Sequence, residues 1–275
     1  MSPRLALPEI PLGGEITGEV TRGVVRVGGT VRRPVRPSSP AVHALLRHLE
    51  AAGFDGAPRA LGTDHLGRQV LTYVEGEVPG RPLPGYAVTG EALAALARLL
   101  RRFHYAAASF TPPPAARWED GSAVGDQPEI VGHCDVTPRN VVFRPSSSGG
   151  GALVPYALID FDLARPVTRL FDVVTTLRHW APIADPVDRD PVQRTLDAGA
   201  RLRLFCDAYG LGPRDRLRLL ETARTRFGRS YQVMRDKARA EPGWARMWAD
   251  GAGERIRRAA AWLDANEDAL HAHLM

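Results

Sequence analysis

The sequence predicts an α+β protein in two lobes: a small antiparallel β-sheet with one helix, followed by a larger and mostly helical part. Three observations predict this arrangement. In the first 75 residues valine alternates with polar residues, as is typical of half-buried strands. A segment rich in Pro and Gly at 78–90 predicts a linker. Beyond it, apolar residues recur mainly at helical spacing.

Composition is that of an ordinary globular protein. The 275 residues suffice for one large domain or two modest ones, and 44% of them are hydrophobic and 24% charged. The net charge of +5 comes almost entirely from arginine. Arg98, Arg101 and Arg102 alternate with apolar residues at helical spacing, so we interpret such arginines as a solvated helix face. We therefore expect no nucleic-acid partner.

The cysteines and the lack of long apolar runs predict the compartment. Cys134 and Cys206 form no CxxC pair, so neither a zinc site nor a disulfide framework is expected. Free thiols are typical of a reducing cytoplasm. The N-terminal "MSPRLALPEIPLGGE" has no signal-peptide core, and no run approaches the roughly 18 apolar residues of a membrane helix. We expect a cytoplasmic protein with no membrane partner; the oligomeric state has no sequence signal.

The first region reads as strands around one helix. "GEVTRGVVRVGGTVRRPV" predicts a hairpin with a tight turn at Gly28 and Gly29. "SSPAVHALLRHLEAAG" predicts a helix with Ser39 as N-cap, Pro40 in the first turn and a stop at Gly53. "RQVLTYVEGE" predicts another strand, which ends at Gly76.

The second region begins with a long helix, "TGEALAALARLLRRFHYAAASF", with Thr89 as N-cap and Glu91 in its first turn. Two short strands are predicted in "NVVF" and "YALIDFDLA", joined by the loop "RPSSSGGGALVP". From residue 171 the pattern is helical, with breaks near 181–190, 210–213 and 241–243.

The segment "HCDVTPRN" at 133–140 carries a pattern suited to phosphoryl transfer. That reaction needs a carboxylate to deprotonate the acceptor hydroxyl, oxygen ligands for Mg²⁺, and positive charge on the phosphates. Asp135 is the candidate base, and Asn140 and Asp160 are candidate metal ligands. A hairpin between the two short strands would bring residues 140 and 160 together. The ordered set is more specific than any of its parts.

These segments resemble the aminoglycoside phosphotransferase family, which has a protein-kinase-like fold. "HCDVTPRN" matches the family's HGDxxxxN loop, with Cys134 where glycine is usual, and "LIDFD" matches its metal-binding segment. "RLFDVVTTLRHW" resembles the following helix, whose Asp172 would brace the loop. "RQVLTYVEGE" resembles the hinge strand between the lobes. The resemblance runs from about residue 12 to the end.

The resemblance implies an N-terminal nucleotide-binding lobe at 1–77, with a hinge near 71–77, and a helical lobe at 78–275. It implies a kinase that uses ATP or another NTP with Mg²⁺ to phosphorylate a hydroxyl of a small polar metabolite or antibiotic. Asp135 would be the base, and Asn140 and Asp160 would bind Mg²⁺. The adenine edge would pair with the backbone of Thr72, Tyr73, Val74 and Glu75. His133, Asp172 and Asp162 would support the site.

The family's N-lobe lysine is missing, because the single lysine is Lys237. On "TVRRPV", alternation sends Arg33 inward with Val31, so Arg33 is the candidate phosphate clamp and Arg26 its rival. The next helix offers no early glutamate, so we expect this arginine to lack an anionic partner. The glycines at 13, 14, 18 and 23 do not form GxGxxG. A pseudokinase that binds a nucleotide or ligand is the alternative.

The acceptor is not specified by the sequence. Residues 190–275, where the family holds its acceptor, contain more arginine than carboxylate. This balance argues against a cationic aminoglycoside and leaves open a biosynthetic metabolite, including an anionic one.

Overall fold

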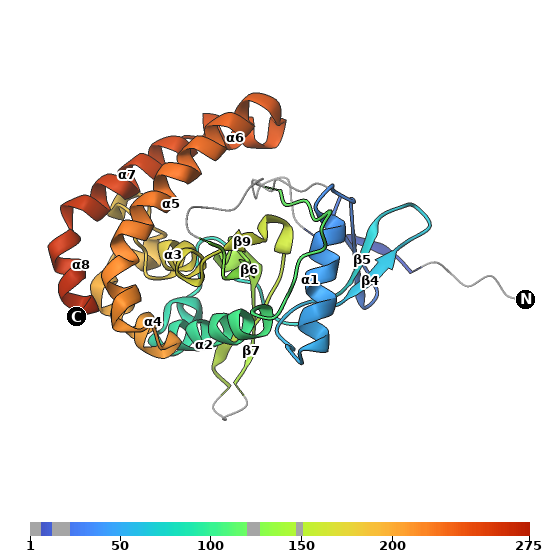
Figure 1. Ribbon diagram of the computed structural model, residues 1–275, viewed down its shortest axis with the longest axis horizontal. Coiled ribbons are helices and arrows are strands. Elements are labelled where there is room, and N and C mark those ends of the chain that lie inside the picture. Colours follow the sequence, from blue (N-terminus) through green and yellow to red (C-terminus); the bar gives the residue numbers. More distant parts are fainter. Residues whose placement is uncertain (1–6, 13–22, 120–126, 147–150) are drawn as a thin grey trace, which may run out of the picture.

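The computed structural model describes residues 7–12, 23–119, 127–146 and 151–275. Its N-terminal part is an antiparallel sheet of strand order β1-β2-β3-β5-β4 together with helix α1 (Figure 1). The elements are β1 (Glu9–Pro11), β2 (Val25–Val27), β3 (Thr30–Arg33), α1 (Ser39–Ala51), β4 (Ala60–Thr63) and β5 (Gln69–Thr72).

The predicted hairpin at Gly28 and Gly29 is confirmed as β2–β3, with Gly28 at φ 59°. This left-handed conformation favours glycine. The inward direction of Arg33 is also confirmed, because its side chain is buried. The strand predicted to end at Gly76 is shorter: β5 ends at Thr72, and Tyr73 N–H then bonds to the Gly29 carbonyl.

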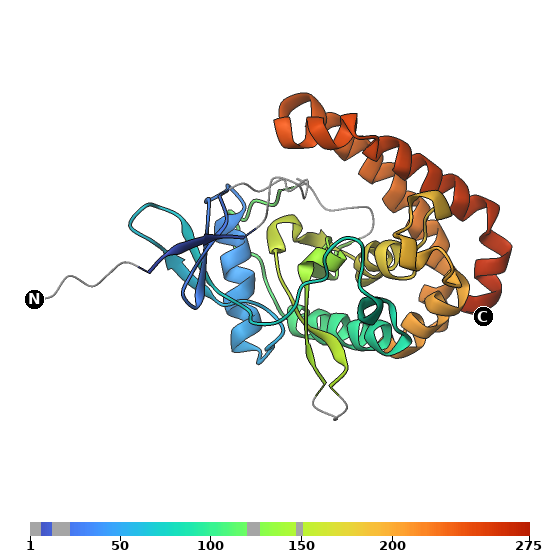
Figure 2. The same ribbon diagram turned by 180° about the vertical axis from the view of Figure 1, so that it is seen from behind.

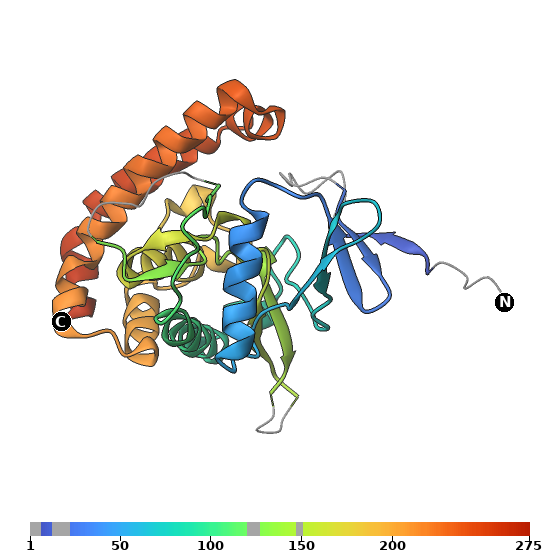
Figure 3. The ribbon, with the colours of Figure 1, turned by 45° about the vertical axis from the view of Figure 1, so that its right-hand side comes forward.

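Helix α1 lies between the sheet and the helical lobe (Figure 3). Its buried side chains include Leu45, Leu46 and Leu49, which belong to the same core as α2. The prediction of Ser39 as N-cap is wrong by one residue, since Ser38 holds that position. The Ser39 hydroxyl instead accepts from the backbone N–H of Arg36 at 2.9 Å, which closes the preceding turn.

The second part is mostly helical and carries two small β-ribbons, β6–β9 and β7–β8. Its elements are η1 (Gly85–Val88), α2 (Gly90–Ala107), β6 (Ile130–Gly132), η2 (Pro138–Asn140), β7 (Val141–Pro145), β8 (Leu153–Leu158), η3 (Phe161–Leu163), β9 (Arg165–Val167), α3 (Arg169–Trp180), η4 (Pro186–Asp188), η5 (Pro191–Gln193), α4 (Ala198–Tyr209), α5 (Pro213–Ala240), α6 (Pro242–Ala249), α7 (Ala252–Ala265) and α8 (Glu267–Leu274).

Helix α2 is the centre of this lobe. The Thr89 side chain accepts from Ala92 N–H, so the predicted N-cap is confirmed. The apolar face of α2 is fully buried, whereas Arg98, Arg101 and Arg102 are exposed as predicted. The predicted helix breaks are also confirmed by the ends of α3, α4 and α5.

The N-terminal sheet and the helices α5 and α7 lie at opposite ends of the molecule (Figures 1 and 2). Helices α5 and α7 run side by side, and α6 joins them at the end nearer the N-terminal sheet (Figure 3). The β6–β9 and β7–β8 ribbons lie between these two ends. In the described part of the chain, no helix is both long and apolar enough to cross a membrane.

Candidate active site

Asp135 is held at the start of loop 133–140 by Asn140. The Asn140 side-chain amide donates to the Asp135 carbonyl oxygen at 2.9 Å and to its carboxylate Oδ2 at 2.8 Å. Burial and the nearby Asp160 charge raise the pKa of Asp135 to about 7, against the opposing effects of Arg226, the Asn140 bond and Arg165. A carboxyl with a pKa near neutrality is matched to accepting a proton from a hydroxyl.

Asp172, in the first turn of α3, fixes the backbone just before this base. Its carboxylate is buried and accepts from the backbone N–H groups of His133 and Cys134, each at 2.8 Å. Burial would raise the pKa of Asp172, but the hydrogen bond from His104, the nearby histidines and the hydrogen bond from Cys134 N–H hold it below its usual value. Gly132 permits this approach, because a Cβ there would lie 2.8 Å from Asp172 Oδ2.

Two buried histidines complete the support. His133 donates from Nε2 to the Ile159 carbonyl at 3.0 Å and accepts at Nδ1 from Asp135 N–H at 3.3 Å. Burial lowers the pKa of His133, so its ring is neutral at neutral pH. His104 links Asp172 to the Tyr209 hydroxyl, at 3.1 and 2.7 Å.

Cys134 adopts a left-handed backbone conformation, with φ 62°. Only glycine adopts it without steric cost, which explains why glycine suits this position of the loop. The Cys134 side chain packs in a small cluster with Val167 and Phe171. This packing offsets part of the backbone strain.

The β7–β8 hairpin brings Asp160 back to the loop, as the sequence predicted. Ile159 N–H donates to the Asn140 carbonyl at 2.9 Å, which joins the two ends of the hairpin. Asp160 itself is in the left-handed region, with φ 63°. Such strain at a non-glycine residue is common where a side chain is aimed at a functional site.

Arg33 reaches from β3 to this hairpin. Both Nη1 and Nη2 donate to Asp160 Oδ1, at 3.1 and 3.0 Å, and Nη2 also donates to Asp162 Oδ2. Burial acts to lower the pKa of Arg33, but the two carboxylates outweigh it and raise it. The expectation that Arg33 lacks an anionic partner is therefore wrong. Its partners come from the metal-side hairpin rather than from the helix after β3.

Arg26, the rival candidate, points to the hinge segment instead. Its Nη2 donates to Glu75 Oε1 at 2.6 Å, and its guanidinium lies 3.8 Å from the centroid of the Tyr73 ring. The backbone N–H groups of Thr72 and Tyr73 are already bound, to Arg59 and Gly29 carbonyls. Val74 takes part in none of the backbone hydrogen bonds of the described residues outside strands and helices.

The donor chemistry around Asp160 fits Mg²⁺. Asp160 and Asp162 offer carboxylate oxygens, and Asn140 offers an amide oxygen, since its contacts with Asp135 are made by Nδ2. Hard oxygen ligands in small number are what Mg²⁺ prefers when phosphate and water complete its shell. Within the described ranges, no group of three His, Cys, Asp or Glu side chains has metal-binding geometry.

The sequence did not single out two arginines that act on Asp135. Arg226 on α5 and Arg165 on β9 both act to lower the pKa of Asp135. Arg226 donates from Nε to Thr175 Oγ1 on α3 at 3.2 Å. In the sequence these residues look like part of a solvated, arginine-rich helix and a loop, and only the three-dimensional contact distinguishes them.

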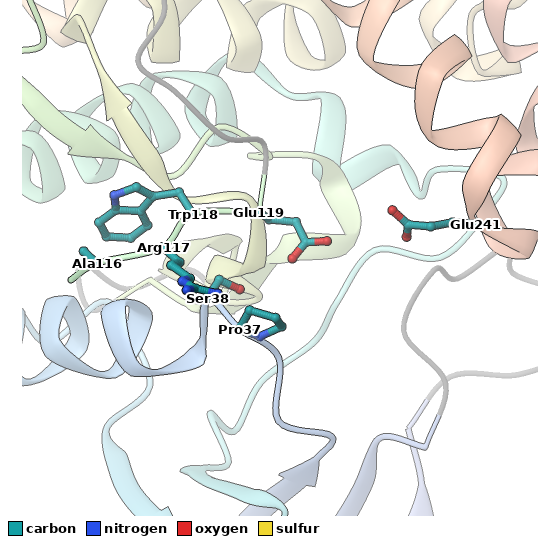
Figure 4. A pocket seen from close by; sticks show the side chains of 7 residues that line it. All are labelled: Pro37, Ser38, Ala116, Arg117, Trp118, Glu119 and Glu241. Carbon is teal, nitrogen blue, oxygen red and sulfur yellow. The ribbon is translucent and has the colours of Figure 1, made fainter.

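A cavity of about 540 Å³ lies beside the start of α1 (Figure 4). It is lined by Pro37, Ser38, residues 116–119 and Glu241, and none of these belongs to loop 133–140. Glu119 at its edge pairs with Arg36 at 3.2 Å and with Lys237 at 3.4 Å. The single lysine of the chain thus lies on α5 and not on β3, and Glu119 and Arg36 connect it to the Asp162 carboxylate that Arg33 binds. The glycines at 13, 14 and 18 lie outside the described residues.

Comparison with known proteins agrees with this geometry. A profile of the phosphotransferase enzyme family matches residues 17–123 and 114–205. The chain belongs to this family. The trifolitoxin immunity protein of Rhizobium leguminosarum bv. trifolii is a relative of this chain. The two are 33% identical over 276 residues, which cover 94% of this chain and 97% of the relative. The predicted resemblance, and with it the phosphotransferase assignment, is confirmed.

Solved structures share the fold. The GDP complex of aminoglycoside 2'-phosphotransferase-IIIa matches with a TM-score of 0.59 at 16% identity, covering 93% of each chain. A choline/ethanolamine kinase family protein from Mesorhizobium loti matches with a TM-score of 0.62 at 16% identity, covering 97% of this chain and 92% of that one. The predicted two-lobed α+β, protein-kinase-like fold is confirmed.

Proposed function

We propose that this phosphotransferase is an active small-molecule kinase that transfers the γ-phosphoryl group of ATP, or of another NTP, to a hydroxyl. The observation that carries the proposal is the Asp135 carboxylate, which is held by Asn140 at 2.8 Å and has a raised pKa of about 7. Asp160 is joined to the same place by the Ile159–Asn140 hydrogen bond. The candidate base and the candidate metal ligands therefore come from loop 133–140 and from the segment that follows β8.

In the proposed reaction Asp135 accepts the proton of the acceptor hydroxyl while the hydroxyl oxygen forms a bond to the γ-phosphorus. The bond between the γ-phosphorus and the bridging oxygen breaks, and the nucleoside diphosphate leaves. Asp172 keeps the loop backbone in place through its two amide contacts. His133 and Asp162 support the site, as the resemblance implies.

Asn140 and Asp160 are the proposed Mg²⁺ ligands, and Mg²⁺ would neutralise charge on the transferring phosphate. Arg33 is the proposed phosphate clamp. Because its guanidinium already lies at Asp160, a phosphate that approaches the metal ligands also approaches Arg33. The hinge at 72–75 is proposed to bind the adenine ring of the nucleotide. Val74 would offer its backbone N–H and carbonyl, which make none of the backbone hydrogen bonds of the described residues outside strands and helices. Residues 1–77 and 78–275 are the proposed lobes.

Two measurements test this proposal together. Thermal shift with Mg·ATP detects nucleotide binding, and an assay of nucleotide diphosphate release across a panel of hydroxyl compounds detects turnover. We expect both in the wild-type chain. Asp160→Ala should abolish the dependence of turnover on Mg²⁺ concentration or turnover itself, whereas an unchanged dependence would contradict the proposed metal site.

The alternative is a pseudokinase, and one observation favours it. Both terminal nitrogens of Arg33 occupy Asp160 Oδ1, so a built-in cation competes with a metal for that oxygen. Binding of Mg·ATP without turnover on any compound of the panel would support this alternative.

The acceptor is proposed to be a small polar metabolite or an antibiotic. The 33% identical relative is named as an immunity protein for trifolitoxin, and this name favours an antibiotic over a metabolite as the acceptor. Under this proposal the chain would protect a sensitive bacterium by phosphorylating a toxic compound. Expression of the wild-type chain, but not of an Asp135→Ala variant, should raise the concentration of trifolitoxin that stops growth. Equal growth with the two would argue against protection by phosphorylation.

A further inference from the structure

The guanidinium of Arg178, near the end of α3, has a buried donor with no hydrogen-bond partner in the described part of the chain. Its Nη1 is shielded from solvent and has no hydrogen-bond partner among the described residues. The Phe227 ring of α5 lies beside it, with Cζ 4.9 Å from the ring centroid. A cation–π contact offsets only part of the cost of taking a guanidinium out of water. The donor is therefore suited to an anion.

The charges that act on Arg178 are mostly cations. Burial, together with the charges of Arg226 of α5 and Arg255 of α7, lowers the pKa of Arg178 to about 9 against the opposing effect of Asp188. Arg178 is still charged at neutral pH. The Asp188 carboxylate is held by Arg258, which donates to it at 2.8 and 2.6 Å. Asp188 is thus engaged elsewhere.

The neighbouring His179 does not supply a counter-charge. Burial, followed by the charges of Arg178, Arg226 and Arg81, holds the pKa of His179 well below its usual value. Its ring is neutral at neutral pH. Positive charge from α3, α5, α7 and residue 81 therefore gathers around one place.

This cationic place lies next to the proposed base. Arg226 acts on the pKa of both Arg178 and Asp135. Its Nε donates to Thr175, one turn before Arg178 on α3. Trp180, at the end of the same helix, donates from its indole nitrogen to the carbonyl of Val136 at 2.7 Å, and Val136 follows Asp135 directly.

We propose that Arg178 and Arg226 bind an oxyanion group of the acceptor, a carboxylate or a phosphate, on the α3–α5 side of Asp135. This inference rests on the proposed kinase function and narrows its acceptor to a small hydroxyl compound with an anionic group. A guanidinium presents paired N–H donors that match either oxyanion. A cationic acceptor would be repelled by the same charges.

Equilibrium binding of a matched set of probes tests the site. Glycerol 3-phosphate, glycerate and glycerol share a hydroxyl skeleton and differ in the anionic group. Calorimetry on the full chain with Mg·ADP present, at physiological salt, should give an affinity for glycerol 3-phosphate or glycerate at least about tenfold above that for glycerol. The more tightly bound of the two anionic probes identifies the group as phosphate or carboxylate. Equal affinities for all three probes would overturn the proposal.

Variants locate the binding. Arg178→Gln should lower the affinity for the more tightly bound anionic probe by about tenfold or more, and Arg178→Lys should retain part of that affinity. Arg214→Gln removes the same charge from an exposed position of α5 and should change the affinity less than about twofold. Arg226→Gln provides a second variant if Arg178→Gln does not fold, as judged by its melting temperature. If Arg178→Gln and Arg226→Gln lose no more affinity for the anionic probe than Arg214→Gln does, the proposed site is contradicted.

Turnover separates this inference from the function on which it rests. In an active kinase, Arg178→Gln should raise KM for the anionic acceptor and leave kcat within a few fold, while Asp135→Ala abolishes kcat. If Arg178→Gln loses anion binding and the wild-type chain shows no turnover, the results support the oxyanion site and contradict the kinase function. Turnover of neutral or cationic acceptors with KM unaffected by Arg178→Gln would support the kinase and contradict the oxyanion site.

Discussion

At the scale of single residues, the proposed chemistry depends on two carboxylates, the half-buried Asp135 and the fully buried Asp172, whose pKa values are shifted in opposite directions. Asp135 has a pKa raised to about 7 by burial and by Asp160, whereas hydrogen bonds hold the pKa of Asp172 low. One is poised to exchange a proton and the other remains ionised as a fixed acceptor. Environments that separate two carboxyl groups in this way are typical of acid–base sites.

This difference predicts a pH dependence. Asp135 must be ionised to act as a base, so kcat/KM should fall as pH drops through the pKa near 7, approaching tenfold for each further unit. Mg²⁺ at Asp160 removes a repelling charge, so a higher Mg²⁺ concentration should move the inflection to lower pH. Rate profiles at two Mg²⁺ concentrations test both points. Activity that is flat from about pH 5 to 8 would contradict the role of Asp135.

Asp172 offers a prediction on stability. Asp172→Ala leaves the backbone N–H groups of His133 and Cys134 without their acceptor in a buried place. Each unsatisfied donor costs about 1–3 kcal/mol, so the free energy of unfolding should fall by roughly 3–5 kcal/mol. Asp172→Asn keeps one acceptor oxygen and should lose less. Urea unfolding measures both, and equal losses in the two variants would contradict this account of the carboxylate.

The site residues were partly predictable from sequence because their order is local. Asp135, Asn140 and Asp160 were predicted from one loop and one hairpin, and strand alternation gave the inward direction of Arg33. The partners of Arg33 were not predictable, because Asp160 and Asp162 are 127 and 129 residues away along the chain. Arg178 and Arg226 were missed since arginines on amphipathic helices usually face solvent.

At the scale of elements, the crossing of the hinge segment over β7 joins the sheet to the helical lobe. Glu77 and Phe143 exchange two backbone hydrogen bonds, at 2.9 and 2.7 Å. Gly76 adopts φ 143°, and a Cβ there would meet Val142 and lie 2.5 Å from the Phe143 carbonyl oxygen. The crossing therefore requires glycine.

Gly76→Ala should destabilise the chain by about 2–4 kcal/mol, because it combines backbone strain with a clash against β7. Gly67→Ala is the matched control, since Gly67 also has a positive φ but a Cβ there meets nothing within 4 Å. The control should cost about 1 kcal/mol. Comparable losses of melting temperature in the two variants would show that the clash with β7 does not matter.

The long helices were predicted well, whereas several of the short strands were not. The long helices α2 and α5 carry enough periodic residues to be recognised, and α2 begins at the predicted cap, Thr89. β1, β6 and β9 have three residues each and β4 has four, which is too short for a periodic pattern. They form because neighbouring strands satisfy their backbone groups, which is a property of the whole sheet.

At the scale of the whole molecule, a row of charges connects the lobes. Arg33 of β3 pairs with Asp160 and Asp162, Arg36 lies 3.4 Å from Asp162 and pairs with Glu119, and Glu119 also pairs with Lys237 of α5. Arg33, the proposed phosphate clamp, is thus part of a network that reaches the helical lobe.

Arg33→Met tests this network. Removing the guanidinium frees Asp160 and leaves two neighbouring carboxylates, so the nucleotide-free chain should bind Mg²⁺ roughly tenfold more tightly. The same variant should bind Mg·ATP more weakly, because a phosphate contact is lost. Calorimetric titrations with Mg²⁺ and with Mg·ATP measure the two effects. Unchanged affinities for both would mean that Arg33 contacts neither metal nor phosphate.

The central claim is that Asp135 is the base of an active kinase, and the most direct measurement is turnover of Mg·ATP with a hydroxyl acceptor. Asp135→Ala should keep nucleotide binding and lower kcat by at least about a hundredfold. Asp236→Ala, which removes an exposed carboxylate of α5, should keep kcat within about twofold. Full turnover in Asp135→Ala would contradict the account.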